Sequence, residues 1–311
     1  MGQTHWGWLV AIYLFLGGMG AGSLLTAAVV ELTGERYKHA FCPTTLIGAG
    51  VSGPLVIIGS LLLIFDLGAG KMEPWRIIYM FTHFTSVMTW GIWLLTLFIP
   101  VSLLYGLMEI MDNYPGILAW LRRFLKFLPA TLPYRSIRRV LAGVGAVLAV
   151  GVAIYTGILL SVVRAVPLWH TPLLPLLFLV SAGSTGMGLT IDLGATIAVP
   201  DVARRFHALP IIHIVLIGLE AVLIGLVLAV AWLQGGVAAE SARLVLMGPN
   251  AVIFWAFVVF PGLFYPFVVH AYAIGARRHG FISGILSGAG IVIAGLFLRY
   301  LIVFSGIPVA L

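Results

Sequence analysis

Eight long apolar runs constrain the fold of this chain more than any other feature. They cover residues 6–30, 44–66, 77–108, 138–163, 172–199, 208–233, 249–275 and 281–307. A membrane-spanning helix takes roughly 20 mostly apolar residues, and inside lipid each backbone polar group must be hydrogen-bonded within the protein. The alternating pattern of a membrane β-barrel is absent. We therefore expect an all-α integral membrane protein with eight transmembrane helices, forming one polytopic domain over residues 1–311.

Charge and cysteine content exclude several classes of function. Only 9% of residues are charged, against roughly 25% in an average soluble domain. The net charge of +7 does not indicate nucleic-acid binding, because the basic residues lie in short connections between the apolar runs. The chain has one cysteine, Cys42, whereas an iron–sulfur cluster takes about four thiolates. An iron–sulfur cluster would therefore belong to a partner protein.

The distribution of basic residues predicts the orientation in the membrane. Twelve of the 17 Lys and Arg residues fall in the connections after the first, third, fifth and seventh runs. By the positive-inside rule both termini are expected outside the cytoplasm, which is the periplasmic side if the membrane is a bacterial or archaeal cytoplasmic membrane. Six tryptophans fall near that side, as in an aromatic belt: Trp6, Trp8, Trp75, Trp169, Trp232 and Trp255. Residues 116–128 are expected to form a short cationic helix in the opposite interface. The N-terminus lacks the basic region of a secretory signal, so we expect the first run to be retained.

Two runs of small residues, at 17–23 and 181–188, lie four spans apart. Small residues let membrane helices approach closely. Their similarity also suggests two four-helix bundles of related arrangement.

Ionisable residues inside a membrane cost about 2.5–3.5 kcal/mol or more each, so each one suggests a function. On the predicted map, only three acidic residues lie in or at the edge of spans: Asp66, Asp192 and Glu220. Asp66 is expected at the periplasmic end of the second span, with His83 two turns inside the third and Tyr155 in the outer half of the fourth. Together these groups could hydrogen-bond the oxygens of a quinone and transfer protons. The alternatives are an ion pair of Asp66 with Lys71 or Arg76, an interhelical hydrogen bond for His83, and ordinary packing for Tyr155.

A second polar group is predicted in the cytoplasmic half. Asp192, His213 and Glu220 could relay protons, with His213 and Glu220 seven residues apart on one helix face. The alternative is hydrogen bonding that fixes the fifth span against the sixth. His213 and His270 are the one histidine pair at a matching level for a haem. We expect neither haem nor iron–sulfur cluster in this chain, and no metal site is predicted.

Several sequence motifs resemble those of the NrfD-like family, the membrane subunits of polysulfide reductases. They are YLFLGGMGAGS (13–23), IFDLG (64–68), HFTSVMTWGIW (83–93), YTGILLSVVRAVPLW (155–169) and LPLLFLVSAGSTG (174–186). The resemblance implies an eight-helix anchor that holds menaquinone or ubiquinone near the periplasmic face. It places His83, Tyr155 and Asp66 near that quinone. Some members carry polar residues early in the first helix, where this chain is apolar around Leu9 and Ile12.

The resemblance also implies partners. They are a ferredoxin-like iron–sulfur subunit and a molybdopterin or multihaem cytochrome catalytic subunit. Arg164, Pro167, Trp169 and His170 form an outer loop suited to docking, and Arg164 and Trp169 are also candidates for quinone contacts. The expected function is a quinone-interacting anchor subunit of a respiratory oxidoreductase complex, not active alone, with proton transfer as an accompanying step. Two alternatives are a passive anchor and a secondary transporter, which would need midplane charges.

Overall fold

The computed structural model describes residues 6–34, 42–66, 81–113, 134–195, 208–276 and 281–309. Over these residues the regular secondary structure is helical. Eight helices are long and apolar enough to cross a membrane, which confirms the predicted fold class. The proposed interfacial helix at 116–128 lies outside the described residues.

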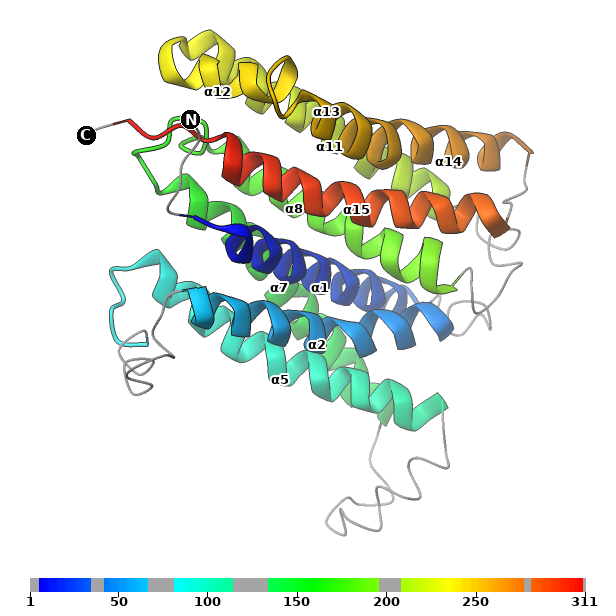
Figure 1. Cartoon of the computed structure of the whole chain (residues 1–311). Helices are drawn as coiled ribbons and strands as arrows, with labels where there is room; N and C mark the ends of the chain where they lie inside the picture. The colour runs from blue at the N-terminus through cyan, green and yellow to red at the C-terminus, as the bar shows by residue number, and fades with distance from the viewer. Residues whose placement is uncertain are drawn as a thin grey trace.

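The first four spans form one bundle (Figure 1). They are α1 (Trp8–Leu32), α2 (Cys42–Asp66), α5 (Val87–Asn113) and α7 (Tyr134–Ser161). In this bundle α1 packs against α2 and α7, and α5 packs against the same two helices. Two of the helices contain a proline, Pro54 in α2 and Pro100 in α5.

The second four spans form the other bundle. They are α8 (Leu173–Met187) continued by the π-helix η2 (Gly188–Ala195), α11 (Ala208–Gln234), the segment α13 (Ala251–Ile253), η3 (Phe254–Phe264) and α14 (Tyr265–Ala276), and α15 (Phe281–Ser305). Here α8 packs against α11, and α15 packs against η2 and η3. The expected pair of four-helix bundles is therefore confirmed.

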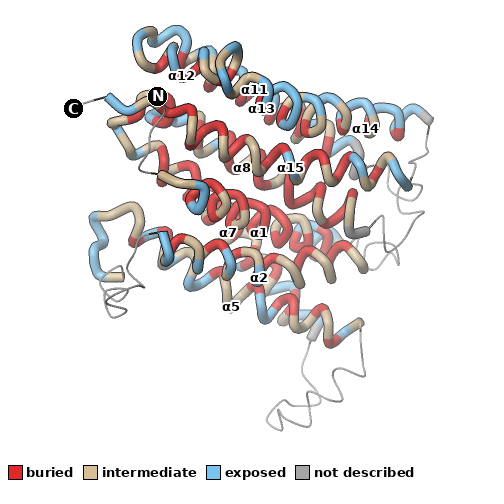
Figure 2. The backbone as a smooth tube through the Cα atoms, in the orientation of Figure 1, coloured by how far each residue is buried: buried red, intermediate tan, exposed pale blue. Residues whose placement is uncertain are grey.

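A crossing of α1 and α8 joins the two bundles. A Cβ atom built on Gly22 would lie 1.8 Å from the carbonyl oxygen of Ala182, and one on Gly186 would lie 2.1 Å from the carbonyl carbon of Gly22. The two backbones are thus in direct contact, as the small-residue runs predicted. Figure 2 shows that α1 and α8 are largely buried, and they are the two most buried spans.

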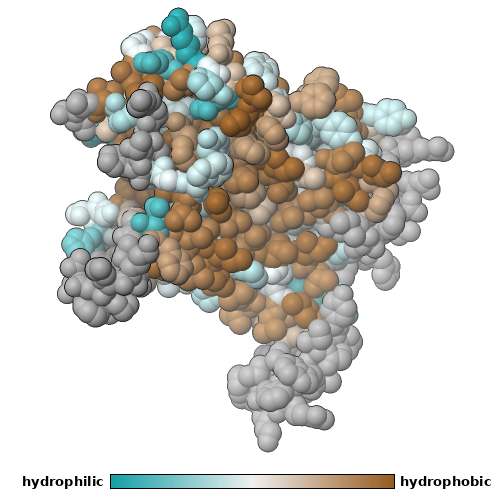
Figure 3. All heavy atoms as spheres, in the orientation of Figure 1, coloured by the Kyte–Doolittle hydropathy of each residue, from teal (hydrophilic) through white to brown (hydrophobic). Residues whose placement is uncertain are grey.

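Both chain termini lie at the same end of the molecule (Figure 1). We call this the termini end; α2 ends there at Asp66 and α7 at Ser161. The other end is called the far end. Between the two ends the outward surface is mainly apolar in the view of Figure 3, as a lipid-facing surface must be. That the termini end faces the periplasm stays a prediction.

Two elements differ from the sequence prediction. The third span begins at Val87 rather than near residue 77. A short amphipathic helix, α12 (Gly236–Leu246), lies in the connection between the sixth and seventh apolar runs, where no helix was predicted. Its outer face carries Glu240 and Arg243, and its inner face buries Ala238, Ala242 and Val245. The apolar residues of this segment are too few for a membrane span, so hydropathy alone did not predict the helix.

Candidate functional site

Two buried tyrosines form the centre of the candidate site at the termini end. Tyr13 of α1 and Tyr155 of α7 are each 4% exposed and belong to one apolar cluster. Neither hydroxyl has a hydrogen-bond partner among the described residues. Tyr13 lies close enough to Tyr155 and Asp66 for an electrostatic interaction. A buried hydroxyl without a partner costs about 1–3 kcal/mol, so a water molecule or a polar ligand is expected to supply the missing hydrogen bonds.

A glycine on α5 makes room for one of these rings. A Cβ on Gly91 would lie 1.7 Å from Cζ of Tyr155, so any side chain at that position would displace the phenol. Tyr155 was predicted from the sequence. Tyr13 was missed, although it begins the YLFLGG motif, because a single tyrosine in an apolar helix does not reveal that its hydroxyl lacks a partner.

Asp66 lies at the edge of this site, within electrostatic reach of Tyr13, and His83 lies in the segment before α5. Asp66 is the last residue of α2, at the end of the second span as predicted, and it is exposed. Its alternative partners, Lys71 and Arg76, lie outside the described residues. His83 was expected inside the third span, and that placement is wrong: it lies before α5 in an exposed turn.

The turn at residues 81–86 has its own hydrogen bonds. The indole N–H of Trp93 donates to the carbonyl oxygen of Phe81, and that of Trp90 donates to Phe84. The hydroxyl of Thr82 lies 3.3 Å from Nδ1 of His83. The two indoles thus hold the backbone of the turn through local hydrogen bonds.

The candidate docking and quinone-contact residues of the outer loop between α7 and α8 lie in two different environments. Arg164 and His170 are exposed and line a surface depression together with Thr171. Trp169 is 1% exposed, and its indole N–H donates to the carbonyl oxygen of Ile302 at 2.6 Å. This tryptophan therefore anchors the loop on α15, and its one donor is already used.

A second polar group lies at the far end of the second bundle, where Asp192, His213 and Glu220 were predicted. Oδ2 of Asp192 lies 3.2 Å from Nδ1 of His213 and 3.3 Å from Nε2 of His270. The three side chains are at most 6% exposed and come from η2, α11 and α14. The structure thus brings His270 into a group from which the sequence argument had left it out.

Glu220 continues this polar group toward the middle of the bundle. It is buried beside Ser181 and Ser184 of α8 and lies within electrostatic reach of His213 and Arg299. Arg299 of α15 is fully buried; its guanidinium donates to the Ser181 hydroxyl and lies over the ring of Phe178. The sequence argument did not single out this arginine, which is a buried cation inside the second bundle.

A third polar cluster, at the far end of the first bundle, was missed. Arg138 of α7 is 4% exposed and forms ion pairs with Glu31 at 3.2 Å, Glu109 at 3.5 Å and Asp112 at 2.7 Å. Glu109 also accepts a hydrogen bond from Thr45. The expectation that only three acidic residues lie in or at the edge of spans is therefore wrong. Glu31 and Glu109 are fully buried within α1 and α5, and the sequence map had counted them as connection residues.

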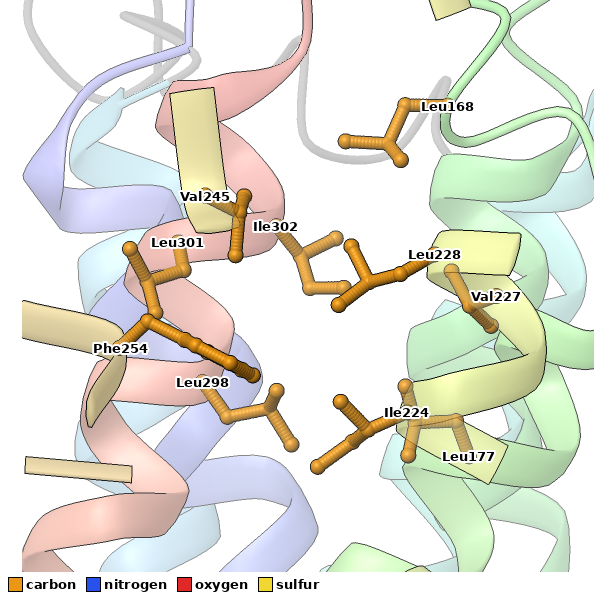
Figure 4. A pocket seen from close by; sticks show the side chains of 10 residues that line it. All are labelled: Leu168, Leu177, Ile224, Val227, Leu228, Val245, Phe254, Leu298, Leu301 and Ile302. Carbon is orange, nitrogen blue, oxygen red and sulfur yellow. The ribbon is translucent and has the colours of Figure 1, made fainter. Parts of the chain in front are cut away.

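An apolar cavity lies in the second bundle toward the termini end (Figure 4). Its lining is Leu168, Leu177, Ile224, Val227, Leu228, Val245, Phe254, Leu298, Leu301 and Ile302, with no polar side chain among them. Ile224, Leu228 and Phe254 also line an apolar surface groove between α11 and η3. The enclosed space is small, about 20 Å³, which is room for about one water molecule.

Comparisons with known proteins place the sequence in one family. A family model described as "Polysulphide reductase, NrfD" matches residues 1–310. The C subunit of polysulfide reductase from Wolinella succinogenes is 34% identical over 310 residues, covering 97% of this chain and 94% of the relative. Protein NrfD of Escherichia coli is 35% identical over 60% of this chain and 58% of its own length.

An archaeal relative extends the set. It is the Hdr-like menaquinol oxidoreductase integral membrane subunit of Archaeoglobus fulgidus, 24% identical over 86% of this chain and 62% of the relative. The whole-length family match and the eight candidate spans lead to one conclusion. The chain is a multi-span membrane protein that belongs to the NrfD family.

Proposed function

We propose that this chain is the quinone-interacting membrane subunit of a respiratory oxidoreductase complex in the cytoplasmic membrane. In this role it exchanges electrons between the quinone pool and an iron–sulfur partner subunit. Membership of the NrfD family supports its place as a membrane subunit of a respiratory complex. The relative named as a menaquinol oxidoreductase subunit supports menaquinone as the quinone, with ubiquinone as the other candidate.

One observation carries the quinone proposal: the hydroxyls of Tyr13 and Tyr155 are buried without a partner beside an exposed carboxylate, Asp66. Phenol hydroxyls can donate hydrogen bonds to the carbonyl oxygens of a quinone ring. Asp66 stands where a proton can pass between the ring and water, since general acid–base groups must lie within reach of both. The apolar surroundings suit the ring and its tail.

His83 enters this proposal in a changed role. In its exposed turn it cannot be a buried ligand of the ring, but an imidazole at the rim of the site can exchange protons with water. We therefore place Tyr13 and Tyr155 at the headgroup and Asp66 and His83 at the exit for protons.

The proposed partner follows from what the chain lacks. With one cysteine it cannot ligate an iron–sulfur cluster by itself, so electrons must leave the quinone through another subunit. The exposed loop with Arg164 and His170 lies at the termini end, and we propose it as the docking surface for a ferredoxin-like iron–sulfur subunit. The terminal catalytic subunit would be a molybdopterin enzyme or a multihaem cytochrome. Trp169 supports this loop from within.

We also propose that Asp192, His213 and Glu220 transfer protons through the second bundle. Asp192 contacts His213, and Glu220 is electrostatically coupled to the same histidine. Chains of carboxylates and histidines carry protons in membrane pumps. The row begins at the far end and reaches Arg299, deeper in the bundle.

The experiment that tests the quinone site is removal of the two hydroxyls. In the assembled complex, Tyr13→Phe and Tyr155→Phe should each lower quinol-dependent turnover about tenfold, because a lost hydrogen bond of about 1.5 kcal/mol corresponds to roughly that factor. Tyr105→Phe is the matched control, since this tyrosine is buried in the same bundle and donates to the carbonyl oxygen of Ala27 instead. Turnover with an artificial electron donor to the partner should not change. Normal quinol turnover in both variants would favour a passive anchor.

A further inference from the structure

We propose that Asp192, His213 and His270 form a binding site for one divalent transition-metal ion of the zinc class. No relative's name assigns such a site, and it was not predicted from the sequence. One ligand atom from each residue lies within 4.8 Å of the other two. The inference stands independently of the proposed quinone chemistry.

The interatomic distances support a common centre. Nδ1 of His213 and Nε2 of His270 lie 3.2 Å and 3.3 Å from Oδ2 of Asp192. Ligands held at 2.0–2.1 Å in a tetrahedral zinc site are about 3.3 Å apart. The two carboxylate–imidazole distances therefore match two edges of such a tetrahedron, and the two imidazole nitrogens lie within 4.8 Å of each other.

The orientation of the groups supports the same conclusion. Oδ2 of Asp192 and Nδ1 of His213 lie within ion-pair distance at 3.2 Å, and neither atom meets another hydrogen-bond partner among the described residues. Buried polar atoms normally have a partner. Two buried atoms that converge in this way are the arrangement expected of ligands aimed at a shared cation.

The scaffold around the cluster holds the ligands in place. Asp192 projects from the π-helix η2, and π-helical turns inside α-helices are frequent at functional sites. On α15, Gly288 leaves space for this side chain, since a Cβ there would lie 2.8 Å from Cβ of Asp192. The rings of His213 and His270 pack together with centroids 4.6 Å apart.

The donor set selects the class of cation. Two imidazole nitrogens with one carboxylate oxygen suit zinc and its neighbours, whereas magnesium and calcium require mostly oxygen ligands. Three protein ligands leave a fourth position open to water. A bound cation would take the same atoms that transfer protons in the proposed path, so occupancy should inhibit that path.

The test uses the full chain purified in detergent and stripped with a chelator. Titration with Co²⁺ should give the absorption of a tetrahedral ion, saturating at one equivalent per chain and displaced by Zn²⁺. His213→Asn and His270→Asn should abolish it, and His170→Asn, at the exposed outer loop, should leave it unchanged. A band that survives in both cluster variants would overturn the proposal.

Zinc-edge X-ray absorption of the wild-type protein keeps the proposal testable if the variants fail to fold. Two imidazoles and an oxygen ligand are expected. Fewer than two imidazoles, or no tetrahedral cobalt band in the wild-type protein, would refute the site. Since neither measurement involves quinol, failure here leaves the proposed function to its own test.

Discussion

Replacing Gly186 by alanine should force helices α1 and α8 apart and destabilise the protein. The added Cβ would lie 2.1 Å from the carbonyl carbon of Gly22, and the reciprocal change Gly22→Ala would put a Cβ 1.8 Å from the carbonyl oxygen of Ala182. Ordinary contact begins at 3.4 Å, so α1 and α8 must move apart by about 1.3–1.6 Å. Both sides are backbone and cannot rotate away. Overpacking of this kind costs about 1–3 kcal/mol, and about 2 kcal/mol changes the ratio of folded to unfolded protein roughly 30-fold.

Thermal unfolding in detergent, followed by near-UV circular dichroism, measures this cost. Gly225→Ala in α11 is the matched control, because the same added methyl meets nothing within 4 Å and alanine is the better helix former. We expect both crossing variants to unfold at lower temperature than the wild type, and the control to equal or exceed it. If Gly186→Ala and Gly22→Ala unfold no earlier than Gly225→Ala, the direct backbone contact between the bundles is refuted.

Two further predictions concern the buried charges. Arg138→Met should destabilise the protein by about 3–5 kcal/mol, because it removes the buried ion-pair partner that Glu31 and Glu109 share. The exposed neighbour Arg139→Met is the control in the same unfolding assay, and an equal loss there would contradict the prediction. Glu220→Gln should lower proton translocation by the reconstituted complex more than electron transfer, with Glu240→Gln on the surface of α12 as control. An equal loss of proton translocation and electron transfer would contradict the proposal that Glu220 couples the two.

The sequence was sufficient for the main elements of the fold. Apolar length alone predicts the eight spans, because a segment of about 20 such residues has no stable alternative to a helix in lipid. It failed at polar boundaries. The helix was extended back over His83 because the residues before Val87 are apolar enough to extend a run, whereas local hydrogen bonds of Trp90 and Trp93 hold them in a turn.

The candidate sites divide in a similar way. Asp192, His213 and Glu220 were found because a polar residue inside an apolar run is conspicuous, and the spacing of the last two gave their common face. Glu31 and Glu109 were missed because they lie near the ends of spans. A charged residue there costs little free energy, so both were assigned to the connections between spans. Both form ion pairs with Arg138, which lies far away in the sequence.

The sequence by itself determined that this chain spans a membrane eight times, because hydropathy and helix length are local properties. Only the tertiary structure decided which polar groups meet. Asp192 contacts His270, and Arg299 donates to Ser181, in each case between helices far apart along the sequence. The unpartnered hydroxyls of Tyr13 and Tyr155 likewise come from two distant helices. These contacts depend on where the helix backbones cross. At the crossing of α1 and α8, Gly22 and Gly186 allow direct backbone contact because neither has a side chain.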